Sequence, residues 1–343
     1  MLRISKIIFW SLVIVLLLWQ LPWLYNFFMS KPTNSPFTLY SSVVGEFTML
    51  DVEEQEIVYY DRAGRHYTEA EFDSILPMFY YRQLVTDGRF PETICGRAVT
   101  PRDIQNTNFH VRFNPSDINK PQIGLYPLME SMSGRVDLEM PDDVFRITEQ
   151  GIEFIDMQTN TINLEKSARF TEMMQRKGFR FPAIRLSGNP TDRKEYDEGY
   201  VILDADSKLF HLKMIKGRPY CRAIELPEGM TPKHVFITEF TARNMLCFIA
   251  DTENGWWVVK RPSYEVVKTG IPAYNPEAES MIIMGNMFDW TVGISDSDSD
   301  RYYALDADSF ALIDTLIYPT PDKSIPGLTF THYTDEFVRP RFK

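Results

Sequence analysis

The pentapeptide LDADS occupies residues 203–207 and recurs unchanged at residues 305–309. Each copy lies between two strand-like runs, YVILD and LFHLKMI around the first and RYYALD and FALIDTLIY around the second. Short runs of β-branched, aromatic and aliphatic residues bounded by turn residues predict antiparallel strands joined by a tight turn. The repeated pentapeptide therefore indicates a recurring β-hairpin.

A looser form of this hairpin has two or three apolar residues, an Asp, three or four turn residues and further apolar residues. It also occurs at MLDVEEQEIV, FIDMQTNTIN and FIADTENGWWVV, so the marker residues are Asp51, Asp156, Asp204, Asp251 and Asp306. The last four are 48, 47 and 55 residues apart, and the first lies 105 residues before the second. A period of about 40 to 55 residues built of short strands is typical of β-propeller blades. We predict a mainly β fold, an irregular β-propeller-like body with helical insertions.

The Asp of this hairpin has a local structural role in our interpretation. At the end of a strand, its carboxylate can accept hydrogen bonds from the backbone N–H groups of the turn that follows. Over about Ile152 to Pro319 the chain resembles the quinoprotein-like and related bacterial propellers, whose blades carry a similar hairpin. It lacks their regular Trp and uniform blade length, which leaves the number of blades open.

Two helices are predicted to interrupt the strands. Thr68 and Glu71 have the spacing of a capping box, which predicts a helix from Thr68 to about Val85. A second helix is expected over residues 164–177, ended by Gly178. These helices are either insertions between blades or part of a small α+β lobe.

The N-terminal segment from Ile7 to Ser30 has no side chain that is charged at neutral pH. About 20 apolar residues, each rising 1.5 Å, cross a hydrocarbon core of roughly 30 Å, so this segment predicts a transmembrane helix. Arg3 and Lys6 precede it, and Lys31 is the first cation after it. The positive-inside rule then places the N-terminus in the cytoplasm and the body in the periplasm, with the inner membrane between them.

A cleaved signal peptide has the same charge pattern, so removal of the segment is the alternative. Bulky side chains stand where a cleavage site needs small ones, which favours a retained anchor that binds membrane lipid. The residues that mark the anchor are Ile7, Trp10, Leu16, Trp19 and Trp23. We expect an anchor at 1–30, a linker at 31–36, an α+β part of the body at 37–151 and the repeat region at 152–343.

Composition excludes some classes of partner. The chain has 24 % charged residues and a net charge of −11, which argues against binding nucleic acid and against gripping an anionic membrane surface. Its three cysteines are too few for a disulfide scaffold and lack metal-type spacing. Cys221 and Cys247 are the pair that we expect to form a disulfide; the alternative is that Cys95, Cys221 and Cys247 are all buried and reduced.

The sequence has no standard catalytic motif and indicates no particular cofactor. Asp296, Asp298 and Asp300 alternate as calcium ligands do, but Arg301 and Ala307 stand where an EF-hand loop needs Gly and Glu. A solvated turn explains the same aspartates.

Three methionines at regular spacing are the other metal candidates. Met281, Met284 and Met287 recur at every third residue, and clustered thioethers can bind cuprous copper. Apolar filling of a β core explains them equally.

Residues 60–104, YDRAGRHYTEAEFDSILPMFYYRQLVTDGRFPETICGRAVTPRDI, resemble a family of uncharacterised bacterial envelope proteins, a domain of unknown function common in Bacteroidetes. The resemblance implies a single-pass protein whose body lies outside the cytoplasm. It also implies genes beside those of an ABC-transporter permease and ATPase, and it supplies no catalytic residues.

Three functions are consistent with these observations. The first is a non-enzymatic accessory or interaction protein with an integral-membrane partner such as an ABC permease. The second is a sensor that holds a small ligand or a metal in the propeller channel. The third is a hydrolase or oxidoreductase that uses channel carboxylates such as Asp197, Glu198, Asp204 or Asp206, although a fold alone does not confer such chemistry.

Overall fold

Small antiparallel sheets are the main regular structure of the chain in the computed structural model. The structure describes residues 2–29, 35–53, 56–120, 123–132, 134, 137–296, 299–319, 329–330 and 340–341. Its internal contacts divide the chain into two units. One unit comprises residues 37–295 and 301–316, and the other comprises residues 1–36, 296–300 and 317–343. Each unit is described by itself.

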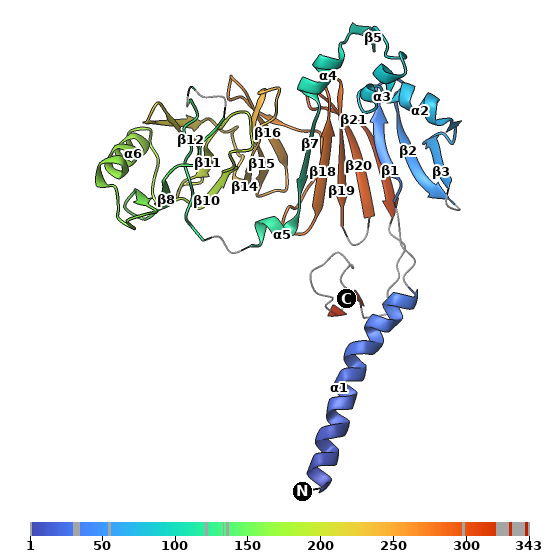
Figure 1. Cartoon of the computed structure of the whole chain (residues 1–343), viewed down its shortest axis with the longest axis horizontal. Helices are drawn as coiled ribbons and strands as arrows, with labels where there is room; N and C mark the ends of the chain where they lie inside the picture. The colour runs from blue at the N-terminus through green and yellow to red at the C-terminus, as the bar shows by residue number, and fades with distance from the viewer. Residues whose placement is uncertain are drawn as a thin grey trace. The chain divides into compact units, whose positions relative to one another are not determined.

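Four sheets carry most of the strands, and within each one neighbouring strands are antiparallel (Figure 1). Three of them are four-stranded meanders that follow chain order. These are β1 (Phe37–Ser41), β2 (Glu46–Glu53), β3 (Glu56–Asp61) and β4 (His66–Tyr67); β10 (Arg185–Gly188), β11 (Tyr200–Leu203), β12 (Leu209–Ile215) and β13 (Arg218–Ile224); and β14 (Pro232–Ile237), β15 (Met245–Asp251), β16 (Trp256–Lys260) and β17 (Val266–Lys268).

The fourth of these sheets has five strands, and one of them comes from a distant part of the chain. Its order is β21 (Leu312–Pro319), β20 (Ser299–Asp306), β19 (Asp289–Ser295), β18 (Ser280–Gly285) and β7 (Phe109–Phe113). Two-stranded sheets are formed by β5 (Thr93–Ile94) with β6 (Arg97–Ala98), β8 (Asp143–Ile147) with β9 (Ile152–Asp156), and β22 (Thr329–Phe330) with β23 (Pro340–Arg341). The fold is mainly β and propeller-like, as the repeated hairpin predicted.

Alternation along β15 shows how the sheets pack. Cys247 and Ile249 contribute to one hydrophobic cluster, whereas Phe248 and Ala250 contribute to another. Successive side chains of a strand point to opposite faces, so the β14–β17 sheet is buried on both sides. This explains why all seven residues of β15 are buried, from Met245 to Asp251.

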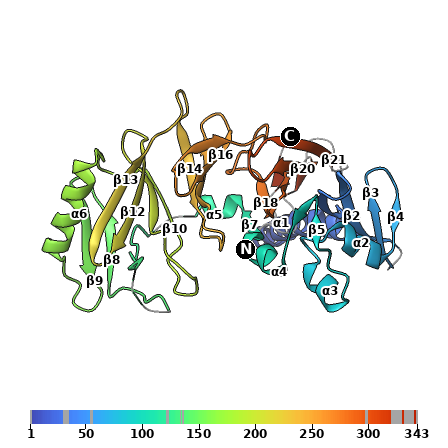
Figure 2. The ribbon, with the colours of Figure 1, turned by 90° about the horizontal axis from the view of Figure 1, so that it is seen from above.

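Side chains alternate between the two faces in other strands of the larger unit as well. In β11, Val201 and Leu203 face the β14–β17 sheet, while Tyr200 and Ile202 face α6 and the β8–β9 hairpin. In β20, Leu305 belongs to the cluster shared with β15 and β16. Figure 2 shows the resulting series from α6 through the β10–β13, β14–β17 and β18–β20 strands to β1–β4.

The first and the last of the four large sheets along the chain are neighbours. Phe47 of β2 is fully buried and shares a cluster with Ala304 of β20. Among the hydrophobic clusters of the described residues, none joins β8–β9 to β1–β4.

The predicted helices are present with one correction. The described helices are α1 (Leu2–Met29), α2 (Glu69–Ile75), α3 (Tyr81–Thr86), α4 (Pro101–Thr107), α5 (Pro115–Ile118) and α6 (Leu164–Arg176), of which α4 and α5 were not predicted. Thr68 and Glu71 form the predicted capping box. The single helix expected from Thr68 to Val85 is wrong, however, because α2 and α3 are separate and Pro77 lies between them. A proline lacks the N–H that a continuous helix needs at this position.

The boundary expected at 151/152 falls inside the β8–β9 hairpin, where Ile147 pairs with Ile152. Strand β7, from the expected N-terminal part, pairs with β18 of the expected repeat region, as Phe113 pairs with Met281. The two expected parts of the body therefore share a hairpin and a sheet.

The other unit contains α1. Among the described helices, this one is long and apolar enough to cross a membrane: its span Arg3–Leu21 has 19 residues, a mean hydropathy of 2.1 and no buried residue. The side chains of Ile7, Trp10, Leu16 and Trp19 are exposed. The side chain of Trp23 lies outside the part that the structure describes. A helix of this kind suits the predicted single-pass anchor.

Candidate functional site

The hairpin aspartates hold turns. Asp204 directly follows β11 and is completely buried; its Oδ1 accepts hydrogen bonds from the backbone N–H groups of Asp206 and Lys208, both at 2.9 Å. Its Oδ2 accepts another from Arg180 N at 3.1 Å. Carboxylates at the ends of three other strands accept turn N–H groups in the same way: Asp156, Asp251 and Asp306. These four carboxylates are therefore hydrogen-bonded to the backbone.

Asp51 is a correction to this set. It lies within β2, opposite Val58, and its Oδ1 accepts a hydrogen bond from the next residue, Val52 N, at 2.7 Å. The residue with the turn role in this sheet is Asp61 at the end of β3, which accepts hydrogen bonds from Arg65 N at 2.9 Å and from the Tyr67 hydroxyl at 2.7 Å. The sequence carries a signal for it, because YYDRAG has the same order of strand, Asp and turn residues.

Among the described residues, the predicted metal candidates do not assemble a site. Asp296 Oδ1 accepts a hydrogen bond from Ser299 N at 2.8 Å in the turn that leads to β20, where Asp300 lies. Asp298 lies outside the described residues. Within the part of the chain that the structure describes, no group of three or more His, Cys, Asp or Glu side chains could hold a metal ion.

The methionines are separated by packing. Met281 lies in the cluster between β15–β16 and β18–β20, Met284 packs against the cluster around Leu39 and Phe72, and Met287 against that around Ile104. Three thioethers in three clusters make no copper site. Their positions match the alternative of apolar core filling.

The cysteines also correct a prediction. Cys221 and Cys247 are free thiols in different hydrophobic clusters, so the expected disulfide is not formed. Burial raises the pKa of Cys221 to about 12 and that of Cys247 further. Cys95 is also free but exposed. The alternative of three buried, reduced thiols is therefore correct for Cys221 and Cys247 but not for Cys95.

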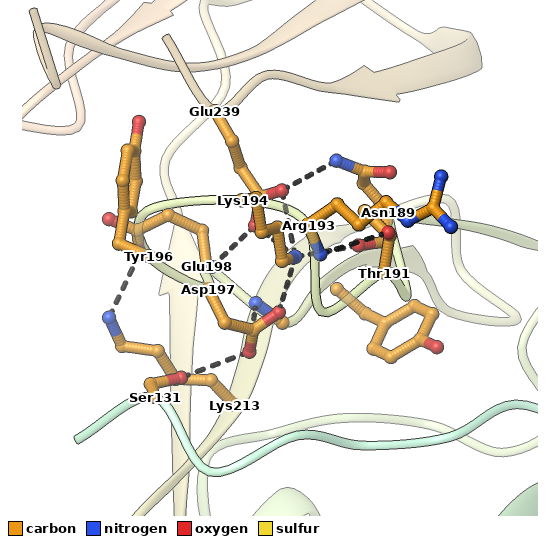
Figure 3. Close-up of polar contacts among 12 residues, drawn as sticks. Ser131, Asn189, Thr191, Arg193, Lys194, Tyr196, Asp197, Glu198, Lys213 and Glu239 are labelled. Carbon is orange, nitrogen blue, oxygen red and sulfur yellow. Dashed lines mark hydrogen bonds and ion pairs between the residues drawn. The ribbon is translucent and has the colours of Figure 1, made fainter. Parts of the chain in front are cut away.

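A buried ionic network contains Asp197, one of the four carboxylates considered for catalysis (Figure 3). Lys194 Nζ contacts Asp197 Oδ1 and Glu239 Oε1, each at 2.7 Å, and these three side chains are 7 %, 3 % and 3 % exposed. Burial outweighs the attraction of Lys194 and raises the pKa of Glu239. Asp197 Oδ2 also accepts a hydrogen bond from the Ser131 hydroxyl at 3.2 Å. The network thus binds the loop before β11 to the loop after β14.

Glu198 has separate cationic partners. Its carboxylate contacts Lys213 at 2.8 Å and Arg261 at 3.1 Å. Burial alone would raise the pKa of Glu198, but the hydrogen bond and charge of Lys213, with the other nearby cations, outweigh it and lower the pKa. Since each of the two acids already has its own counter-charge, neither is poised as a free acid or base.

His211 is a neutral link next to Glu198. Its Nε2 lies 2.6 Å from the Glu198 carbonyl, which can only accept, so Nε2 carries the proton and Nδ1 accepts from the Tyr264 hydroxyl at 2.8 Å. Burial lowers the pKa of His211 to about 4. The two remaining carboxylates lie elsewhere, Asp204 in its turn and Asp206 in an ion pair with Arg180 at 3.1 Å.

A pocket of about 520 Å³ is the better candidate for a functional site. Side chains from β1, the α2–α3 segment, β7, β18 and β19 line it, and most are apolar, such as Leu39, Phe79, Phe109 and Met284. This volume suits a small organic ligand, and an apolar wall with a few polar groups is typical of such sites.

Asp289, the first residue of β19, is the acidic group of this pocket and is 3 % exposed. It is held by the β18–β19 turn, where Asn286 Nδ2 donates to its Oδ1 at 3.2 Å, and by the hydroxyl of Ser42, which donates to its Oδ2. Burial raises the pKa of Asp289 to about 6, although these hydrogen bonds oppose the rise. Among the described residues, no Lys or Arg forms an ion pair with it.

Asn108 adds a second acceptor to the wall of the pocket. Its Nδ2 donates to the Met78 carbonyl at 2.6 Å, which assigns the other amide atom as oxygen. That Oδ1 is buried and has no hydrogen-bond partner in the described structure. Buried polar groups are usually paired, so the unpaired oxygen distinguishes Asn108 among the residues that line the pocket.

Comparison with known families places this architecture. A family model described as Domain of unknown function (DUF4857) matches residues 37–305. The chain belongs to the DUF4857 family. The match confirms the expected membership in a domain of unknown function, and it includes the pocket residues from Leu39 to Thr291.

Propeller and WD40 domains are among the solved structures similar to this DUF4857 chain. The WD40 domain of SCAP from fission yeast is 10 % identical, with a TM-score of 0.33, over 87 % of this chain and 77 % of that one. The Dos1 propeller is 10 % identical, with a TM-score of 0.30, over 52 % of this chain and 44 % of that one. The Cps50 (Swd1) β-propeller domain of Myceliophteria thermophila is 12 % identical, with a TM-score of 0.29, over 58 % and 57 %.

The chain thus spans about half the length of the Dos1 and Cps50 chains that it matches. These likenesses concern the fold alone and say nothing about the activity of the DUF4857 chain. No curated protein matches the sequence.

Proposed function

We propose that this chain is a membrane-anchored, non-enzymatic binding protein that takes up a small ligand in the pocket around Asp289. The observation that carries the proposal is an apolar pocket of about 520 Å³ that contains a buried carboxyl group without a cationic partner. Apolar pockets with a few polar groups and a perturbed carboxyl are preferred binding sites. The ion pairs of Asp197 and Glu198 favour binding over catalysis by those acids.

Location is part of the proposal. The apolar span of α1 and the cations Arg3 and Lys6 before it support an inner-membrane anchor with a cytoplasmic N-terminus and a periplasmic body. Reporter fusions test this orientation: alkaline phosphatase, active only outside the cytoplasm, is expected to be active when fused after Lys343. Activity of a cytoplasmic reporter at the same position would reverse the topology.

An integral-membrane partner, such as an ABC-transporter permease, follows from the same anchor, because the body works within reach of the membrane. The resemblance to bacterial envelope proteins supports this part of the proposal. Crosslinking in membranes followed by purification in mild detergent is expected to recover one defined membrane protein. A chain that purifies alone after efficient crosslinking contradicts it.

Ligand uptake is tested by thermal unfolding of the full chain in mild detergent against a library of small metabolites. At least one class of compound is expected to raise Tm with increasing concentration, because a ligand that binds only the folded state stabilises it. Phe79→Ala removes an exposed wall of the pocket and is expected to weaken the shift, whereas Val85→Ala, exposed on α3 and outside the pocket, preserves it. Absence of any shift across the library overturns this function.

A further inference from the structure

Among the described residues, no Lys or Arg forms an ion pair with Asp289. Two neutral side chains, Ser42 and Asn286, donate hydrogen bonds to its carboxylate, and the group is 3 % exposed. Two neutral side-chain donors do not replace the hydration that an ionised carboxylate loses on burial. By comparison, Asp197 and Glu239 have Lys194 as a counter-charge, and Asp204 accepts three backbone N–H groups.

Other titratable or charged side chains line the pocket or interact with this carboxylate. They are Tyr40 from β1, Tyr81 and Arg82 from α3, Cys95 from the β5–β6 turn and His110 from β7. Arg82 is exposed, and its Nε donates to the Tyr81 hydroxyl at 3.1 Å. The negative charge of Asp289 raises the pKa values of both Tyr40 and Cys95, after burial as the main cause.

The pocket has a surplus of acceptors as well as a missing cation. Asn108 Oδ1 is buried and unpaired, and both Asn108 and Asp289 line the pocket. Aromatic rings also line the pocket, among them Phe79 and Phe109. The faces of such rings attract cations.

We propose that the pocket binds an organic cation, a primary ammonium or guanidinium group on an apolar body, with Asp289 as its counter-charge. The inference deepens the proposed function and rests on it, because it concerns the same pocket. The N–H groups of the ligand donate to Asp289, Asn108 Oδ1 is a further acceptor on the pocket wall, and the apolar body packs against Phe79, Phe109 and Met284.

Selectivity follows from charge. A neutral analogue of the same shape can still donate a hydrogen bond to Asp289, but it leaves the buried carboxylate without a counter-charge. We therefore expect an amine to bind at least tenfold more tightly than the matching alcohol. An anionic analogue meets the same carboxylate and is expected not to bind.

The experiment is isothermal titration of the full chain in mild detergent at pH 7.5 with matched pairs of probes. The amines are benzylamine, 2-phenylethylamine and tryptamine, and their neutral partners are benzyl alcohol, 2-phenylethanol and tryptophol. At least one amine is expected to bind, to exceed its alcohol at least tenfold, and to lose at least tenfold in affinity in Asp289→Asn. Asp308→Asn, an exposed acid in the β20–β21 turn, is the matched control and is expected to bind as the wild type does.

The pH profile separates an ion pair from packing alone. Amine affinity is expected to rise about tenfold per pH unit as Asp289 ionises and to level off above about pH 6. Asp289→Asn is expected to have no such rise. His110→Gln is measured too, because His110 lines the same pocket, and it is expected to keep the rise.

Each outcome decides one of the two proposals. If alcohols bind as tightly as amines, or Asp289→Asn binds amines normally, the cation inference is overturned while the pocket remains a binding site. If no amine binds but a neutral or acidic metabolite raises Tm, the ligand class is wrong. If neither the probes nor the metabolite library binds, the proposed function itself fails.

Discussion

Ser42 donates a hydrogen bond to Asp289 across 247 residues of chain. A second long-range hydrogen bond lies nearby, from Tyr40 N to the Thr291 hydroxyl at 2.9 Å. These bonds join β1 and its turn to β19, so the first and last large sheets along the chain meet at the pocket. A ligand held by Asp289 would contact both sheets and stabilise their packing.

Replacing Asp289 by Asn is expected to stabilise the folded chain at neutral pH. Burial holds the pKa of Asp289 near 6 in the folded state, compared with 3.8 for the ordinary group. The folded state therefore binds more protons than the unfolded state between these values, and the contribution of Asp289 to stability declines as pH rises from about 4 to 6. Two pKa units correspond to about 3 kcal/mol, the upper limit of the gain in Asp289→Asn at pH 7.5.

Urea denaturation between pH 4 and 8 measures this gain. The difference in unfolding free energy between Asp289→Asn and the wild type is expected to grow with pH up to about pH 7 and then stay constant. A difference that does not vary with pH would show that Asp289 is not desolvated. A variant that is more stable but no longer binds amines would mark a group kept for function at a cost in stability.

His211 is expected to have the opposite pH dependence. Burial lowers its pKa to about 4, compared with an ordinary 6.5, so the unfolded state binds more protons between these values and stability rises with pH across them. The contributions of His211 and Asp289 therefore oppose each other between about pH 4 and 6. In Asp289→Asn the opposing contribution of Asp289 is absent, so the pH dependence due to His211 becomes visible. The free energy of unfolding should then fall by about 3 kcal/mol between pH 6.5 and 4.

The measurement compares Asp289→Asn with the double variant Asp289→Asn, His211→Gln by urea denaturation. Gln can still donate to the Glu198 carbonyl, and its neutrality removes the titration. The readout is the slope of the unfolding free energy against pH, because loss of the Tyr264 contact lowers the unfolding free energy at every pH. Equal slopes in the two variants would contradict a buried neutral His211.

How much of the fold the sequence predicts depends on the range of the contacts. MLCFIAD predicts a strand, and β15 forms there, because apolar runs and turn residues act locally. The stacking of sheets is not predictable in this way, since β7 pairs with β18 across more than 160 residues and no periodicity encodes that pairing. The sequence predicts one helix from Thr68 to Val85 because the apolar spacing continues past Pro77. The helical backbone is interrupted there, so two helices form.

The pocket is less predictable still, since its polar groups come from three distant segments. Ser42, Asn108 and Asp289 each have ordinary neighbours in sequence, and their convergence requires the sheet order. One local sign is present: Asp289, at the start of β19, stands between two large aromatic residues, Phe288 and Trp290. The hairpin acids were more accessible to prediction because their partners lie within four residues.

Asp204→Ala is expected to destabilise the chain strongly. Its completely buried carboxylate accepts three backbone N–H groups, and its removal leaves them without partners inside the fold. Buried unpaired donors cost about 1 to 3 kcal/mol each before relaxation, so we expect a loss of about 2 to 4 kcal/mol in unfolding free energy.

The matched control for this variant is Asp206→Ala, two residues away. The side chain of Asp206 is 35 % exposed and forms surface ion pairs with Arg180 and Lys208, at 3.1 and 3.6 Å. Such pairs contribute little, so its loss should be within about 0.5 kcal/mol in the same urea experiment. Equal losses in the two variants would contradict the turn role of Asp204.

Thiol counting tests the packing of the cysteines. Cys95 is exposed, whereas Cys221 and Cys247 are buried in clusters on different faces of the sheets, where oxidation to a disulfide would require unpacking both. One thiol is therefore expected to react with Ellman's reagent in the folded chain, and all three after denaturation without reductant. Labelling at about pH 8.5 is suitable, because partial burial and the charge of Asp289 raise the pKa of Cys95. In Cys95→Ser no thiol should react before denaturation, and a denatured wild-type chain with a single reactive thiol would establish the Cys221–Cys247 bridge instead.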